Sequence, residues 1–321
     1  MAKEKRGRRG FIQSAGLMAG GVLGAGLLPT PAAAQSVPAT SASNKGARLR
    51  SMMAKGDIII APIVPDIIGA RLVEVEGFPA VQIGDSQPTN WYGYPGYGLL
   101  SYTEVLNYSV HIANHMNLPV MVGMGDGGGT PLTVYRATQE LERGGVAAIA
   151  FEDTMMETHF SRQGAVVSKQ QWVDRIKAAL DARKDSNLII IARTDALEQA
   201  VPLDQAIERA AAVAEAGADV IYFAGIKLPD YPKVTAVIKK PLFHLGNPTT
   251  TPDEAKAAKL SFIAYHVDGV INAALYNALH ELKTTGKYEN AAKNTVPREI
   301  QARLTERDDY LSRARKYNMV K

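Results

Sequence analysis

From residue 46 onward, short and continuously apolar runs alternate with longer stretches in which apolar residues recur at helical spacing. The apolar runs span residues 58–63, 80–83, 119–122, 146–151, 188–192, 220–224, 241–245 and 262–265. A strand that is apolar on both faces is typical of a parallel sheet whose outer side is covered by helices. Eight such runs in about 270 residues predict a (β/α)8 barrel, which belongs to the α/β class.

The stretches between these runs have the period of amphipathic helices, as in the series that begins with Trp172 and Ile176. Gly77, Gly144 and Gly217 end three of them, and we expect each to adopt the left-handed conformation of a helix cap. A doubly wound open sheet is the alternative fold, but no Gly-x-Gly-x-x-Gly sequence follows the first run. Residues 47–321 are therefore predicted to form a barrel with an extra C-terminal helix, in an extension that starts at about residue 290.

The N-terminal segment has the pattern of an export signal. A charged start contains the pair Arg8-Arg9, an apolar run covers residues 15–28, and three alanines precede Gln35. This order predicts a twin-arginine signal peptide over residues 1–34 and a periplasmic or secreted protein. The run of 14 residues is short for a membrane span, so we expect no membrane anchor after cleavage. Residues 35–46, rich in Ser, Ala and Thr, are predicted to be a flexible leader.

Composition narrows the possible functions. The formal net charge is +4, but the first 34 residues hold five basic residues and one acidic residue. The remainder has 31 of each sign and is neutral, so we expect no nucleic-acid partner. The chain has no cysteine, which excludes disulfides, thiolate metal sites and a cysteine acid or nucleophile.

Polar residues follow most of the predicted strands at their carboxyl ends, where (β/α)8 barrels carry their active sites. The candidates are Asp66, Gly84, Asp85, the Gly-rich segment 123–129 with Asp126, Glu152, Arg193, Asn247 and His266. The guanidinium of Arg193 suits a substrate carboxylate, and carboxylates suit a hard divalent cation. The alternative is a set of structural ion pairs that join Arg193 to Asp195 or Glu152.

Several segments together resemble the isocitrate lyase/phosphoenolpyruvate mutase superfamily. They are residues 77–81 (GFPAV), 99–105 (LLSYTEV), 140–147 (ELERGGVA), 151–153 (FED), 191–196 (IARTDA) and 214–219 (AEAGAD), in the right order and spacing. The resemblance covers roughly residues 47–285. It implies a barrel, a homotetramer or homodimer with exchanged C-terminal helices, Mg2+, and a small 2-oxo or 2-hydroxy carboxylate as substrate. Members break or form C–C or P–C bonds through enolate-like intermediates.

The chain departs from this family at the metal site. The two aspartates that members place after the third strand align with Gly123 and Gly125, and a third aligns with Gly96. Glu152 is the ligand that remains, and Asp126 stands one residue beyond a lost carboxylate. A one-residue shift in a Gly-rich loop is sterically easy, so Glu152 and Asp126 are the candidate metal ligands. The sequence leaves the binding of Mg2+ open.

The family's lyases also carry a catalytic cysteine in the loop after the fourth strand, and this loop here contains Glu157 and His159 instead. We expect Arg193 to hold the substrate carboxylate, with Asp126 and His159 as further catalytic candidates. Asp66, Asn247 and the backbone at Gly84 and Asp85 would orient the substrate. The expected activity is C–C cleavage by a diverged lyase. The alternatives are a non-catalytic periplasmic carboxylate-binding protein, or a metal-independent hydrolase or decarboxylase.

Overall fold

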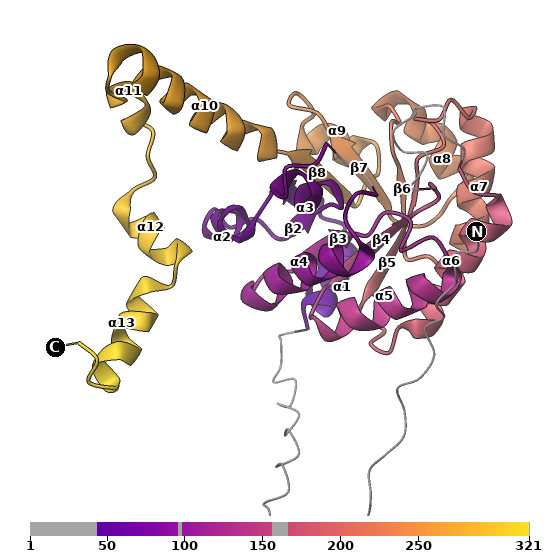
Figure 1. The fold of residues 1–321 in the computed structure, drawn as a ribbon. Coiled ribbons are helices and arrows are strands. Elements are labelled where there is room, and N and C mark those ends of the chain that lie inside the picture. Colours follow the sequence, from indigo (N-terminus) through magenta and orange to yellow (C-terminus); the bar gives the residue numbers. More distant parts are fainter. Residues whose placement is uncertain (1–43, 96–97, 156–165, 321) are drawn as a thin grey trace, which may run out of the picture. The chain divides into compact units, whose positions relative to one another are not determined.

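Eight parallel strands close into a barrel in their order along the sequence (Figure 1). The computed structural model describes residues 44–95, 98–155 and 166–320. The strands are β1 (Ile59–Ile63), β2 (Val81–Ile83), β3 (Val120–Gly123), β4 (Ala148–Glu152), β5 (Ile189–Thr194), β6 (Val220–Phe223), β7 (Leu242–Gly246) and β8 (Phe262–His266). Each coincides with one predicted run to within two residues at either end, so the (β/α)8 prediction is confirmed.

Helices cover the outer side of the barrel, as Figure 1 shows. They are α2 (Ile67–Val75), α3 (Ser86–Trp91), α4 (Tyr102–His115), α5 (Pro131–Arg143), α6 (Lys169–Ala182), α7 (Leu203–Glu215), the short turn η2 (Leu228–Asp230), α8 (Tyr231–Val237) and α9 (Pro252–Ala257). Many begin at a side-chain cap. Ser101, for example, accepts from the backbone of Glu104 while the Glu104 carboxylate accepts from the backbone of Ser101.

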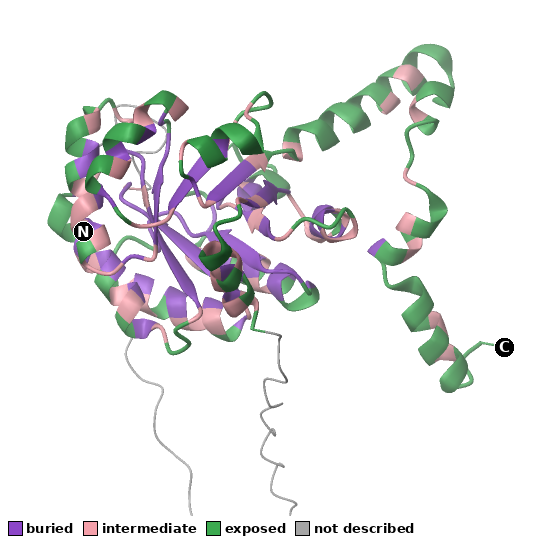
Figure 2. Cartoon of the chain, turned by 180° about the vertical axis from the view of Figure 1, so that it is seen from behind, coloured by how far each residue is buried: buried purple, intermediate pink, exposed green. Residues whose placement is uncertain are grey.

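Alternate residues of each strand enter two separate cores. Figure 2 shows the strands as buried and the helices around them as partly exposed. Inside the barrel lie residues such as Ile191 of β5 and Tyr222 of β6, whereas Ile190 and Ile221 pack outward against the helices. Because side chains alternate along a strand, the position two residues after Ile191 also faces inward. That position is Arg193, at the carboxyl end of the barrel.

Helix α1 (Lys45–Lys55) closes the amino end of the barrel. Leu49 is fully buried in the same cluster as the inward residues of the strands. Lys45 Nζ donates to the backbone oxygen of Ala113 at 2.8 Å, and Arg50 forms an ion pair with Asp219 at 3.0 Å. The helix starts at Lys45, inside the segment predicted as leader. Residues 1–43, with the predicted signal, lie outside the described residues.

Four helices follow β8: α10 (Asp268–Thr285), α11 (Glu289–Ala292), α12 (Arg298–Leu304) and α13 (Arg307–Lys316). The single extra helix predicted for the C-terminal extension is instead divided into α12 and α13, and the chain turns between these two at Glu306, whose φ is 51°. Helix α12 contacts α2, and Arg71 of α2 pairs with Glu306 at 3.0 Å. Helix α10 buries none of its residues, and Figure 2 shows it exposed along its length. The expected homo-oligomer stays a prediction.

None of the helices in residues 44–95, 98–155 and 166–320 is long and apolar enough to cross a bilayer.

The predicted glycine caps are correct at two positions and wrong at one. Gly77 and Gly217 have φ values of 81° and 114°, in the left-handed region. Gly144 has φ −75°, and its neighbour Gly145, at φ 75°, makes the left-handed turn instead. In a Gly-Gly pair either residue can reverse the chain without a steric penalty, so the sequence alone left the position ambiguous.

The contact of α1 with the barrel gives a stability prediction. A Cβ added at Gly46 would lie 2.4 Å from the backbone oxygen of Asn187, so Gly46→Ala must push the helix outward. We expect the free energy of unfolding in urea to fall by about 1–3 kcal/mol. Gly269 of α10 is the matched control, because nothing lies within 4 Å of an added Cβ there. Equal losses in both variants would contradict the predicted contact.

Candidate active site

Arg193 lies at the centre of the charged groups at the carboxyl end of the barrel. Its Nη1 lies 2.6 Å from Oε1 of Glu152 on β4, and its Nε donates to Oδ1 of Asp195 at 2.9 Å. The guanidinium carbon lies 5.2 Å from the ring centre of Tyr222, within the range of a cation–π contact. The ion pairs that the sequence left as the structural alternative are therefore both formed. The side chain of Arg193 nevertheless keeps 19% of its surface exposed, so a ligand can reach it.

Glu152 is almost fully buried, with 1% of its surface exposed. Burial raises its pKa well above the usual value, and the nearby charges of Asp195 and Asp85 raise it further, while Arg193 opposes the shift. The carboxylates of Asp195 and Glu152 in turn outweigh the effect of burial and raise the pKa of Arg193. The carboxyl of Glu152 thus keeps a proton to higher pH than a free glutamic acid does. This favours a smaller negative charge at the open carboxyl end of the barrel, here called the mouth.

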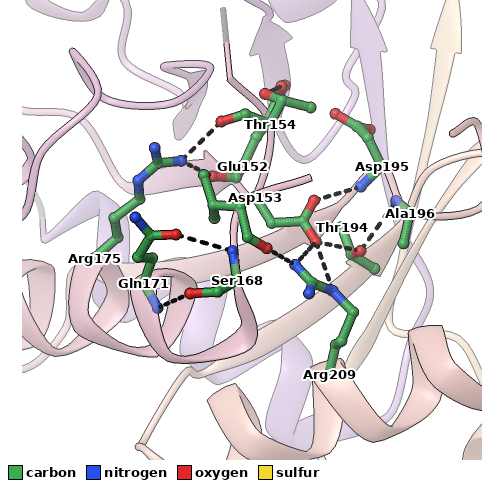
Figure 3. Close-up of polar contacts among 11 residues, drawn as sticks. Glu152, Asp153, Thr154, Ser168, Gln171, Arg175, Thr194, Asp195, Ala196 and Arg209 are labelled. Carbon is green, nitrogen blue, oxygen red and sulfur yellow. Dashed lines mark hydrogen bonds and ion pairs between the residues drawn. The ribbon is translucent and has the colours of Figure 1, made fainter. Parts of the chain in front are cut away.

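A second buried carboxylate, Asp153, ties the ends of β4 and β5 together (Figure 3). Its Oδ1 accepts from the backbone N–H of Asp195 at 2.9 Å. Its Oδ2 accepts from the hydroxyl of Thr194 at 2.8 Å and from Nη2 of Arg209 on α7 at 2.9 Å. Burial raises the pKa of Asp153, and these donors oppose the shift. The network holds the backbone on which Asp195 and Arg193 stand.

Arg175 of α6 joins two loops at the carboxyl end of the barrel, and Figure 3 shows part of its contacts. Its Nη1 donates to the backbone oxygens of Glu152 and Thr154, at 3.1 and 2.9 Å. Its Nη2 donates to the backbone oxygen of Gly129 at 3.0 Å. The loop after β3 is therefore fastened to the end of β4 by one buried side chain.

The loops after β2 and β3 enclose a cavity of about 290 Å³. It is lined by Asp85, Thr89, Leu100, Tyr102, Met124 and Asp126, among others. Asp85 and Asp126 are both nearly buried, at 6% and 7% exposure. Gly84 precedes Asp85, and its N–H donates to Oε1 of Gln87 at 2.8 Å. Of the residues predicted to orient the substrate, Asp85 thus lies at the wall of the cavity. Its negative charge contributes to the raised pKa values of Glu152 and Arg193.

Other predicted residues lie away from this cluster. Asp66 caps α2, where its Oδ1 accepts from the N–H of Gly69 at 2.7 Å, and it lines a separate outer groove with Trp91 and Tyr92. Asn247 is exposed, and its Oδ1 accepts from the backbone of Thr249 and Thr250 within its own turn. His159 lies outside the described residues.

The candidate metal ligands are engaged by the protein itself. Oε1 of Glu152 faces Arg193, and its Oε2 accepts from the Thr154 hydroxyl at 3.0 Å. Oδ1 of Asp126 accepts from the N–H of Gly128 at 2.9 Å. Across residues 44–95, 98–155 and 166–320, no three His, Cys, Asp or Glu side chains converge as a metal-ligand group. Because these oxygens already accept from protein donors, Glu152 and Asp126 by themselves do not make a cation site, and we assign no chemical step to a divalent cation.

The backbone explains why an aspartate is not readily accommodated at position 123. A Cβ at Gly123 would lie 3.3 Å from Cα of Gly84 and 3.5 Å from the backbone nitrogen of Asp85. The ends of β2 and β3 therefore approach closely here, in a way that a side chain on the third strand would disturb.

Three residues that support Arg193 or the loops around it were not predicted from the sequence: Tyr222, Arg175 and Arg209. The inward period of β6 could have placed Tyr222 beside Arg193. The two arginines lie within otherwise apolar helix faces, and a charged residue in such a face is a signal of a buried pairing.

Comparison with known proteins agrees with this geometry. Residues 49–283 match the model of the phosphoenolpyruvate phosphomutase family. An oxaloacetate decarboxylase of Pseudomonas putida is 31% identical, over 84% of this chain and 95% of the relative. A 2-methylisocitrate lyase of Aeropyrum pernix is 32% identical, over 82% of each.

Among solved structures, a phosphonopyruvate hydrolase in complex with oxalate and Mg2+ superposes with a TM-score of 0.75. It is 23% identical and covers 85% of this chain and 99% of its own, which shows a common fold. With the family match over most of the barrel, the chain belongs to the phosphoenolpyruvate phosphomutase family, within the isocitrate lyase/PEP mutase superfamily.

Proposed function

We propose that this protein is a lyase that cleaves a C–C bond in a small 2-oxo or 2-hydroxy carboxylate without a bound metal ion. The observation that carries the proposal is the inward-facing Arg193, held between Glu152 and Asp195 at the open end of a closed barrel. Its relatives act on substrates of this size and charge, as the names oxaloacetate decarboxylase and 2-methylisocitrate lyase state.

Arg193 binds the substrate carboxylate through its exposed edge. When the C–C bond breaks, one of its two carbons keeps the electron pair, which moves into the carbonyl or carboxyl group next to that carbon and gives an enolate. In a 2-oxo acid that loses a carboxylate, the other fragment leaves as CO2. In a 2-hydroxy acid, the hydroxyl proton passes to water as the hydroxyl carbon becomes a C=O group. An N–H donor that faces the enolate oxygen stabilises the enolate more strongly than it stabilises the bound substrate, because the oxygen has gained negative charge. The ion pair with Asp195 fixes the direction of the guanidinium before substrate arrives.

The metal-independent part of the proposal rests on the carboxylates. Gly123 and Gly125 stand where the family's aspartates are expected, and Glu152 and Asp126 spend donor atoms on Arg193 and Gly128. The positive charge that a carboxylate substrate needs comes from Arg193, and the raised pKa of the buried Glu152 makes a negative charge at that carboxyl less favourable.

A turnover assay on the protein without residues 1–34 tests the proposal. The panel contains oxaloacetate, 2-methylisocitrate and a malate-type 2-hydroxy acid, with an enzyme-free blank for each. We expect cleavage of one of them, and a kcat/KM that falls by about 10- to 150-fold or more in Arg193→Gln, because a charged hydrogen bond to the substrate is lost.

Arg313→Gln is the matched control, since Arg313 lies exposed on α13 and pairs with Asp309. Arg193→Lys keeps the positive charge but loses the two parallel N–H donors of the guanidinium. The unfolding midpoint of each variant is measured as well, so that a loss of substrate binding can be told from a loss of folding. Carboxylate binding without turnover of any substrate would support the binding-protein alternative. Full activity in folded Arg193→Gln would overturn the proposal.

We also propose that residues 1–34 direct export through the twin-arginine pathway. The support is the Arg8-Arg9 pair ahead of the apolar run. Replacing both arginines by lysine should abolish the periplasmic pool of the full-length chain in cell fractionation. Lys5→Gln, which leaves the pair intact, should not change it. Equal periplasmic amounts in all three proteins would refute this assignment.

A further inference from the structure

His266 stands at the open end of the barrel and faces the mouth by its position on β8. Phe262 and Ala264 of this strand enter the inner core, so His266, two residues later, has the same inward parity. It lies next to Ile63 of β1, which also enters the inner core. Its side chain is 48% exposed, at the end of the barrel that α1 leaves open.

The ring of His266 is oriented by Asp268, the first residue of α10. Nδ1 of His266 lies 3.2 Å from Oδ1 of Asp268. An ionised carboxylate can only accept, so Nδ1 carries the hydrogen and donates it. The hydrogen bond from His266 is the main reason that the pKa of Asp268 is lowered, which keeps this partner ionised. Nε2 is then the nitrogen on the side away from Asp268.

Asp268 is itself held from the other side of the mouth. Its Oδ2 accepts from Nε2 of Gln87 at 2.9 Å, and Gln87 is 1% exposed. Oε1 of Gln87 accepts from the N–H of Gly84 at 2.8 Å, beside Asp85. A chain of hydrogen bonds therefore runs from the end of β8 through α3 to the end of β2. This chain fixes the position of the imidazole relative to the end of β2. Asp85 lies directly after Gly84 there, and its charge contributes to the raised pKa values of Glu152 and Arg193.

The pairing sets His266 apart from the other histidines of the described ranges. Within the described ranges, no ion pair with a carboxylate is formed by the other histidines, which are His111, His115, His244 and His280. His115 instead contacts the backbone oxygen of His111, and His244 contacts the Tyr231 hydroxyl. A histidine with a carboxylate behind one nitrogen and an accessible second nitrogen is the arrangement of a general acid or base.

We propose that His266, positioned by Asp268 and Gln87, is the proton-transfer residue of this active site. This inference rests on the proposed lyase function. Cleavage leaves the electron pair of the broken C–C bond in an enolate. The imidazolium gives its Nε2 proton to the enolate carbon while the C=O bond re-forms, and the neutral imidazole regains a proton from water. The chain has no cysteine that could supply this proton.

Two measurements with His266→Gln test the proposal. The first is turnover of the panel substrate that the wild type cleaves. The second is exchange of the methyl hydrogens of pyruvate for deuterium in D2O, followed by NMR, which reports proton transfer at carbon without C–C cleavage. We expect both rates to fall at least about 100-fold, oxalate affinity to change less than about threefold, and added imidazole to restore part of the exchange.

His115→Gln is the matched control, because His115 is exposed at the far end of α4. Asp268→Asn should lower kcat more than it raises KM, as expected of a positioning residue. If the wild type cleaves a substrate and folded His266→Gln keeps turnover and exchange within about threefold, the proton-transfer role is wrong and the lyase function stands. If the wild type shows neither turnover nor exchange, the lyase function and this role fail together.

Discussion

A guanidinium buried at the end of a barrel is stable only when carboxylates and hydrogen-bond acceptors surround it, because removing an ion from water costs several kcal/mol. Arg193 meets this need with Glu152 and Asp195. The pairs depend in turn on the relative positions of β4 and β5. Asp153 joins these strand ends by accepting from the backbone of Asp195 and from Arg209, and Arg175 fastens the loop after β3 to the end of β4. Much of the mouth thus serves to hold one cation in place.

The same arrangement supports the proposal that the site works without a bound metal ion. A protein with this fold, a phosphonopyruvate hydrolase, was solved in complex with oxalate and Mg2+. Here the positive charge is covalently part of the chain, and burial shifts Glu152 toward its neutral form. An arginine provides two parallel donors to a carboxylate, so it orients a substrate as well as attracting it. It does not itself deliver a proton to the enolate carbon, so the proposed proton transfer falls to a separate group, His266 at the end of β8.

The barrel was predictable from the sequence because each strand is a continuous apolar run and each helix has a clear period. Arg193 and Glu152 could be placed at the mouth for the same reason: their strands are long enough to fix inward parity. Asp66 and Asn247 could not be assigned in this way, since a polar residue after a strand serves equally as a helix cap or turn former, and the structure shows both in such contacts. The contacts of Arg209 and Asp268 depend on residues far away in the sequence, which no local pattern reveals.

We propose that Arg193, in place of a bound metal ion, supplies the positive charge that the substrate carboxylate needs. A crystal structure of the protein grown with oxalate and an excess of Mg2+ tests it most directly. We predict oxalate oxygens within hydrogen-bond distance of the Arg193 guanidinium and no cation bound to Glu152 or Asp126. An octahedral Mg2+ that joins oxalate to either of these carboxylates would contradict the account.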